Sequence, residues 1–196
     1  LMENLQKMIE SLNLNSQISL NEIPDIDLYM DQVIQLFENK FSSTKRNEDE
    51  KILTKTMINN YAKGKLLFPI KNKKYSKEHL ILISFIYQLK GALSINDIKE
   101  TLSGLNERVM MQNLNIDCFY ESFLHLTEKN IHAFKEEIEQ KGKNVNEEIS
   151  ELKETEATKL EKTLMIASLA HMSNLYRRAA EKVVDELVAE RKLDKI

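Results

Sequence analysis

TKTMINNYAKG, residues 54–64, is the stretch that decides how this chain is organised. Thr54 suits a helix N-cap, because its hydroxyl can accept from a free backbone N–H of the first turn. Gly64 is typical of a helix end. At about 100° per residue, Met57, Ile58 and Tyr61 share one arc. The opposite side holds Lys55, Thr56, Asn59, Asn60 and Lys63. The stretch predicts a short helix that docks one face on a core and presents amides and amines outward.

The segments around this helix predict an all-α fold with one small β element. Ile26, Met30, Val33, Phe37 and Phe41 recur at helical spacing. They predict a helix over residues 24–41, followed by a polar loop over 42–50. Residues 66–75 contain Pro69 and a basic turn, so they predict an extended loop or small hairpin. Further helices are expected over 76–90, 95–103, 117–141 and, after a charged segment 142–158, up to about residue 189.

Glycine and proline are scarce, which argues against a β-rich fold. The chain has four glycines and two prolines. A β-rich protein needs many turns with special backbone angles. Each glycine instead follows a helical pattern, so we expect Gly64, Gly91, Gly104 and Gly142 to end helices with left-handed caps.

Charge is distributed unevenly along the chain. Eight lysines (51, 55, 63, 65, 71, 73, 74 and 77) and no acid occupy residues 51–77. The whole chain carries −3, so the remainder carries about −11. A local cationic patch on an acidic protein is typical of an anion-binding surface, most often for phosphate backbone. Asn59 and Asn60 add side chains that can bond adenine in the major groove.

Composition excludes several classes of protein. The longest apolar stretch, residues 80–89, is about half a membrane span. The first residues do not resemble a secretory signal. Cys118 is the single cysteine, so no internal disulfide can form and a cytoplasmic location is expected. No phosphate loop, nucleophile elbow or paired zinc motif occurs, so we expect no enzyme activity and no cofactor.

The histidines offer a weak alternative. Cys118, His125 and His132 are spaced by seven, too far apart on a helix to share a metal ion. Glu121, His125, Glu128 and His132 are closer, but such i,i+4 groups are more often surface pairs. We therefore expect no metal. His79 and His171, each flanked by apolar residues, are expected to be partly buried.

The region resembles the reading head of mercury-resistance-type (MerR) regulators. Thr56-Met57, Gly64, Leu66-Leu67 and Pro69 look like that class's second helix leading into its wing, and Lys74-Tyr75-Ser76 is similar to the signature that closes the wing. Residues 66–75 are called the wing below. The resemblance implies contacts with double-stranded DNA at Thr56, Asn59, Asn60, Lys63, Lys74 and Tyr75. Charge adds Lys55, Lys65, Lys71 and Lys73.

A closer resemblance extends over residues 21–105. The stretches Ile23–Gln32, Thr54–Tyr61 and Lys73–Ser76 look like an uncharacterised bacterial family with a MerR-like head. We therefore expect two domains, a DNA-binding head over 20–105 and a helical dimerisation or effector region over 106–196. The effector, a small molecule or a protein, is left open.

The last helix carries an apolar stripe with nearly heptad spacing. Its residues are Met165, Leu169, Met172, Tyr176, Ala179, Val183 and Leu187. The spacing fits a coiled-coil seam and fits a core-facing stripe equally well. MerR-type proteins dimerise through a helix after the head, so the resemblance favours a homodimer.

Two functions follow as hypotheses. The first is a sequence-specific DNA-binding transcriptional regulator. The second is an adaptor that uses the same helix–wing–helix form to bind an acidic protein.

Overall fold

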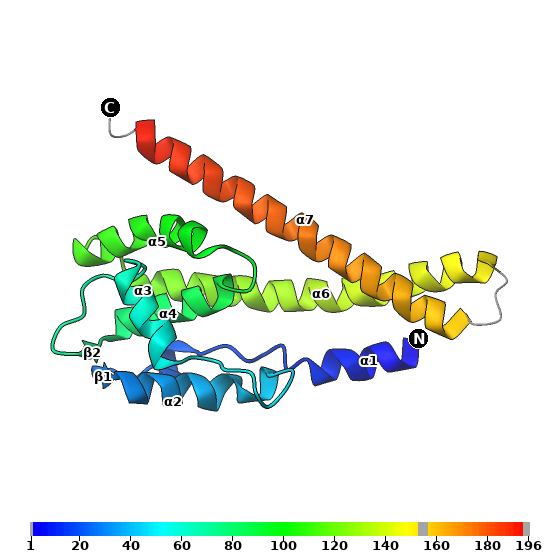
Figure 1. Cartoon of the computed structure of the whole chain (residues 1–196), viewed down its shortest axis with the longest axis horizontal. Coiled ribbons are helices and arrows are strands. Elements are labelled where there is room, and N and C mark those ends of the chain that lie inside the picture. Colours follow the sequence, from blue (N-terminus) through cyan, green and yellow to red (C-terminus); the bar gives the residue numbers. More distant parts are fainter. Residues whose placement is uncertain (1, 153–156, 194–196) are drawn as a thin grey trace. The chain divides into compact units, whose positions relative to one another are not determined.

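The computed structural model describes residues 2–152 and 157–193. These residues are mostly helical, with one small two-stranded antiparallel sheet and a long C-terminal helix (Figure 1). The predicted mainly helical fold with a small β element is confirmed. The chain forms two compact units. The larger unit combines Ser16–Leu124 with the described part of Ala179–Ile196, and the smaller unit combines the described parts of Leu1–Asn15 and His125–Arg178.

The larger unit contains most of the secondary-structure elements. In chain order these are η1 (Leu20–Glu22), β1 (Leu28–Tyr29), α2 (Met30–Phe41), η2 (Ser42–Thr44), α3 (Lys55–Lys63), β2 (Lys74–Tyr75), α4 (Lys77–Leu89) and α5 (Ile95–Met110). The start of α6 (Ile116–Leu152) and the end of α7 (Ala157–Leu193) complete it. The smaller unit holds α1 (Met2–Ser11) and the remaining described parts of α6 and α7.

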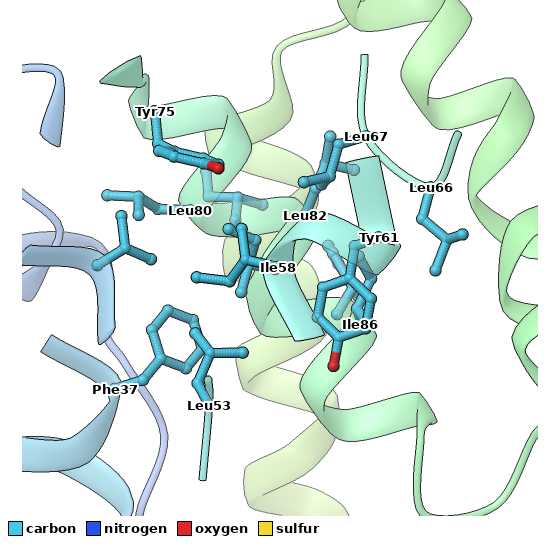
Figure 2. Close-up of a cluster of buried hydrophobic side chains, with 14 of the residues drawn as sticks. Phe37, Leu53, Ile58, Tyr61, Leu66, Leu67, Tyr75, Leu80, Leu82 and Ile86 are labelled. Atoms are coloured by element: carbon cyan, nitrogen blue, oxygen red, sulfur yellow. The ribbon is translucent and has the colours of Figure 1, made fainter. Parts of the chain in front are cut away.

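Helix α4 is the centre of the larger unit's core. Every residue from His79 to Ile86 is buried. A helix that is apolar all round must be covered on all sides. Figure 2 shows Leu80, Leu82 and Ile86 of α4 gathered with Ile58 and Tyr61 of α3, and with Phe37 of α2. Helix α3 therefore packs against α4.

The sheet corrects the predicted start of the first long helix. Leu28 pairs with Tyr75 and Tyr29 pairs with Lys74, so residues before α2 close the wing. The helix expected from residue 24 begins at Met30. The Tyr29 N–H donates to Gln32 Oε1 at 2.8 Å, which satisfies a free donor at the new start. Pro24 and two acids resemble a first turn in sequence, but the buried Leu28 is needed in the sheet.

The prediction that the glycines form left-handed helix caps was wrong. No glycine in residues 2–152 and 157–193 has a positive φ. Helix α5 continues through Gly104 to Met110, and α6 continues through Gly142 to Leu152. A Cβ at Gly104 would lie 3.2 Å from Nη2 of Arg191, whose side chain crosses α5 there. This glycine therefore permits a close approach and does not end a helix.

The smaller unit has its own core, to which the first residues of the apolar stripe of α7 contribute. Its buried residues are Leu5, Ile9, Ile138, Val145, Ile149 and Met165. Helix α1 was not predicted, although Leu5 and Ile9 have helical spacing. Met165 is only 4% exposed, and Leu169 packs against this core. The start of the predicted seam is therefore a core face.

The second half of α7 packs through a different face. Val184 is buried in the larger unit's core, with Ala180 and Val188 packed against it. Tyr176 and Val183, from the predicted seam, are 62% and 63% exposed. The predicted domain boundary between residues 105 and 106 falls inside α5. The larger unit begins before residue 20, where the head was expected to start, and continues past residue 105.

Candidate nucleic-acid interface

Helix α3 separates its apolar and polar residues as the sequence predicts. Thr54 Oγ1 accepts from the Met57 N–H at 3.2 Å and caps the helix. Ile58 and Tyr61 are buried, and Figure 2 shows both in one cluster with Leu82 and Ile86 of α4. The exposed residues are Lys55, Thr56, Asn59, Asn60 and Lys63. The helix therefore presents two neighbouring carboxamides, flanked by amines, on a face that the core leaves open.

At the end of α3, a lysine occupies the left-handed position in which glycine is more usual. Gly64 caps the helix with ordinary helical angles, whereas Lys65 has φ 59°. The Leu66 N–H donates to Tyr61 O at 2.9 Å, and the Lys65 N–H to Ala62 O at 3.1 Å. This is a Schellman arrangement with lysine in the left-handed position. Glycine fits one residue earlier, because a Cβ there would lie 3.0 Å from Asn60 O and 2.9 Å from Leu66 Cδ1, and the Leu66 side chain would have to shift. Lys65 is thereby held at the junction of helix and wing.

The wing ends in a tight two-residue turn. Lys71 and Lys74 form a β-bridge, and the Lys74 N–H donates to Lys71 O at 2.9 Å. Asn72 and Lys73 both have positive φ, 52° and 58°. Two left-handed central residues define a type I′ turn, the kind that matches the twist of paired strands. The turn exposes Lys71, Asn72 and Lys73 together at the tip.

The two tyrosines of the sheet have opposite environments. Tyr75, a predicted DNA contact, is 3% exposed, and burial raises the pKa of its hydroxyl. Its ring belongs to the core, so we remove it from the candidate interface. Tyr29 is 55% exposed, and the Lys74 ammonium lies 5.1 Å from its ring centroid. A cation–π contact at this distance holds Lys74 against the sheet.

His79 fastens the wing to α4. Its Nδ1 accepts from the Ser76 N–H at 3.1 Å, and its Nε2 lies 3.2 Å from Phe68 O. These partners require a neutral ring with its proton on Nε2. The ring stacks on Phe68, with 3.8 Å between centroids, and meets Tyr75 edge-on. Burial lowers the pKa of His79. His79 is buried, contrary to the partial exposure expected from sequence, and it contacts both sides of the wing.

Two of the eight lysines are paired with acids from elsewhere in the chain. Lys55 lies 2.7 Å from Asp31, and Lys77 lies 2.8 Å from Asp117 and 3.7 Å from Asp25. The hydrogen bond with Asp117 is the main cause that raises the pKa of Lys77. Lys77 therefore ties α4 to α6. Within the described residues, no carboxylate pairs with the other six: Lys51, Lys63, Lys65, Lys71, Lys73 and Lys74.

The basic surface continues onto a residue that the sequence analysis missed. A hollow of about 260 Å³ lies between the end of α3 and the start of α5. Lys63, Lys65 and Lys99 line it, together with Asn96. Lys99 lies outside the lysine-rich stretch and is followed by Glu100, so its sequence context carries no signal. Only the packing of α5 beside α3 brings it to the patch.

The alternative sites are not assembled. Among the described residues, no three His, Cys, Asp or Glu side chains are arranged to hold a metal ion. His132 lies 3.6 Å from Glu136, four residues later on the same helix. Cys118 and His171 are exposed. Within the described part of the chain, the helices lack an apolar stretch long enough to span a membrane.

The comparisons with known proteins place most of the larger unit in one family. No curated protein and no solved structure is significantly similar to the chain. The family model described as "Domain of unknown function (DUF1836)" matches residues 18–123, more than half of the chain. The match includes α2, α3, the wing, α4 and α5. The chain therefore belongs to the DUF1836 family.

Proposed function

We propose that this protein is a sequence-specific, double-stranded-DNA-binding transcriptional regulator with a MerR-like head. Helix α3 enters the major groove, and the wing contacts the phosphate backbone. Base edges are read by Asn59 and Asn60, and the phosphates are held by the lysines of the wing and of the α3 end. Lys99 extends the backbone-binding surface beyond the residues expected from sequence.

The exposed face of α3 is the observation that carries the proposal. Asn has weak helix propensity, and an Asn pair in mid-helix contributes nothing to the core on which α3 is docked. Both amides are exposed. Asn offers paired donor and acceptor groups that match adenine in the major groove. An amide pair beside unpaired lysines combines base reading with phosphate binding, which one surface needs for specific DNA recognition.

The order of elements supports the MerR-like assignment. A short strand, two helices, a wing whose strand returns to the first strand, and two buttressing helices follow one another from β1 to α5. Thr54 caps α3, and Ser76 starts α4 directly after the wing. These are the positions on which the resemblance rests. The His79 contacts then set the angle between α3 and the wing through α4.

Direct binding of the purified full chain to genomic duplex fragments tests the proposal. Fluorescence anisotropy at several salt concentrations is the measurement. We expect binding whose logarithm falls linearly with the logarithm of salt concentration, because phosphate contacts release counterions. We also expect a subset of fragments to bind at least about a thousandfold more tightly than bulk DNA. Absence of binding by the folded protein at low salt would refute the proposal.

An acidic protein partner is the competing outcome. Such a partner would use the lysines but has no need of Asn59 and Asn60. If the chain binds all duplexes equally and weakly, and an acidic polypeptide such as polyglutamate displaces it at equal charge concentration, the adaptor hypothesis is favoured. Retained discrimination between duplexes in excess polyglutamate supports the regulator.

We extend the proposal to a homodimer formed through the exposed part of the α7 stripe. One short helix and one wing provide little contact area for tight binding at cellular salt. Two-fold pairing of heads is the usual remedy, and two-fold dimers are the commonest oligomers. Because Met165 is in a core, the seam is limited to the exposed residues Tyr176, Ala179 and Val183.

Charge insertion at exposed positions tests the dimer. In Tyr176→Asp/Val183→Asp, two carboxylates would meet their copies across the two-fold axis. Both side chains are largely exposed in the single chain, so the variant should keep its fold. We expect a dimer for the parent and a folded monomer for the variant by analytical ultracentrifugation, with circular dichroism as the control. A monomeric parent at about 100 µM would contradict the seam, since typical specific interfaces bind far more tightly.

A further inference from the structure

A second, larger hollow is lined by the base of the wing, by α5 and by the end of α3. Its volume is about 520 Å³, within the range of small-molecule sites. Leu67, Phe68, Pro69 and Ile70 line it from the wing, and Met110 lines it from α5. The remaining lining residues are Ala62, Lys65, Lys99, Ser103, Asn106 and Glu107. All belong to the larger unit, so the cavity is built within one folded body.

One side chain of this cavity has a buried polar atom without a partner. Asn106 is 8% exposed, and its Nδ2 donates to Leu66 O at 3.0 Å and to Leu102 O at 2.9 Å. Two carbonyl acceptors fix the orientation of the amide, because a flipped group would set oxygen against oxygen. Asn106 Oδ1 then has no hydrogen-bond donor within the described residues. A buried acceptor left unsatisfied is costly, and a ligand donor at this position would relieve that cost.

Three charged residues line the cavity, Lys65, Lys99 and Glu107, so its lining carries a net charge of +1. Lys65 and Lys99 line both this cavity and the smaller hollow beside α3. No carboxylate among the described residues is ion-paired with either lysine. The wing wall, by contrast, is entirely apolar from Leu67 to Ile70. The cavity lining thus combines a net positive charge, an apolar wall and one buried acceptor without a donor.

We propose that this cavity binds a small amphipathic acid that carries an N–H or O–H donor on its apolar body. The carboxylate would lie toward Lys65 and Lys99, and the body along residues 67–70. The donor would reach Asn106 Oδ1 after a small displacement of the cavity wall. N-acylated amino acids and hydroxylated fatty acids have this chemistry. The binding does not require DNA, so it stands or falls separately from the proposed function.

The position of the cavity gives such a ligand a defined structural effect. It would contact Ala62 and Lys65 at the end of α3, the base of the wing, and α5. The same wing base is also held by the His79 ring, which stacks on Phe68. A bound acid would therefore add a second restraint on the wing and make the site a candidate for effector control.

N-Octanoylglycine, which has a carboxylate, an N–H donor and an apolar tail, is the probe for the test. Octanoate lacks the donor, and octylamine reverses the charge. Amide chemical shifts of the 15N-labelled full chain are followed without DNA. We expect N-octanoylglycine to change the amide chemical shifts of residues 67–70 and 99–107. Its affinity should be several-fold higher than that of octanoate and at least about tenfold higher than that of octylamine.

Three variants localise the binding. Met110→Trp fills the cavity from an exposed position and should abolish the shifts. Lys99→Glu should weaken binding by about tenfold, because an attractive charge becomes a repulsive one. Arg108→Glu changes charge on the same helix outside the cavity lining and should bind like the parent. Shifts elsewhere, equal binding of the acid and the amine, or undiminished binding by folded Met110→Trp would overturn the proposal.

Discussion

Helices α3 and α7 both carry apolar residues at helical spacing, but the pattern has a different outcome in each. In the nine-residue α3, the apolar arc docks on α4, and every residue of the opposite side is exposed. In the 37-residue α7, the stripe begins as part of one core at Met165 and becomes exposed by Tyr176. Farther along, the helix packs through Val184, about a quarter turn away from the predicted seam.

The difference follows from how many cores a helix serves. A short helix meets one core, so its periodicity identifies its buried face directly. A long helix that contributes to two units meets each core with whichever face lies toward it. A continuous stripe in such a helix is therefore an average over two environments. The comparison supports the α3 face as an interface and limits the α7 seam to the residues that neither core covers.

The largest expected effect separates the two kinds of position within α7. Met165→Ala should destabilise the protein by about 2–5 kcal/mol, because it leaves a cavity in the smaller unit's core. Its neighbour Ile166 is 68% exposed, so Ile166→Ala should change stability by no more than about 0.5 kcal/mol. Urea unfolding followed by circular dichroism measures both. Equal effects would show that the stripe is not divided as described.

Charge removal at the wing should give the next largest effect. Lys71→Gln/Lys73→Gln/Lys74→Gln should weaken binding to all duplexes, because in the proposed complex these lysines contact phosphates and not bases. Removing three contacts should reduce the salt slope by about 2.7, so between 50 and 200 mM salt the parent should lose about 40-fold more affinity than the variant.

The matched control for the wing changes three exposed lysines of α6. Lys129→Gln/Lys135→Gln/Lys143→Gln has the same net charge as the wing variant, but its substitutions lie in the smaller unit. It should retain nearly the parent's salt slope. If both variants lose slope equally, net charge alone attracts DNA and the wing has no special role.

The smallest effect concerns the pH dependence of the wing support. Burial lowers the pKa of His79 in the folded state, whereas the unfolded chain has the ordinary value of 6.5. As the pH falls below about 6.5, His79 binds a proton in the unfolded chain but stays neutral in the folded chain. His79 therefore makes the free energy of unfolding decrease with falling pH, by up to about 1.4 kcal/mol per pH unit.

Urea unfolding between pH 5 and 7.5 checks this prediction. The difference in stability between the parent and His79→Gln should narrow as the pH falls, because the variant has no proton to take up at this position. Identical pH profiles for the two proteins would show that the ring titrates alike in the folded and unfolded chains, contrary to its burial.

The α3 surface was predictable because it depends on local patterns. Thr54, the arc of Met57, Ile58 and Tyr61, and the exposed Asn pair follow from residue type and spacing within one short segment. The structure confirms the cap and both faces. The start of α4 after Ser76 was predictable for the same reason, since a serine followed closely by an acidic residue, here Glu78, marks a helix N-terminus.

The features that the sequence did not predict depend on contacts between residues that are distant in sequence. Tyr75 is drawn into the core because its strand pairs with Leu28. Lys55 and Lys77 lose their free charge to acids on other elements. Gly104 lies within α5, beside the guanidinium of Arg191. Lys99 joins the basic surface only through the packing of α5. No local pattern carries these contacts.

Discrimination between DNA sequences by the α3 amides tests the central claim most directly. Duplexes selected by the parent from a random pool are compared with scrambled duplexes by anisotropy at fixed salt. We predict that Asn59→Ala and Asn60→Ala each reduce the preference for selected over scrambled duplexes by about 1–3 kcal/mol, with nearly unchanged affinity for scrambled DNA. Asn130→Ala, an exposed asparagine of α6, should retain the full preference. Unchanged discrimination in both α3 variants would contradict the assignment of α3 as the reading helix.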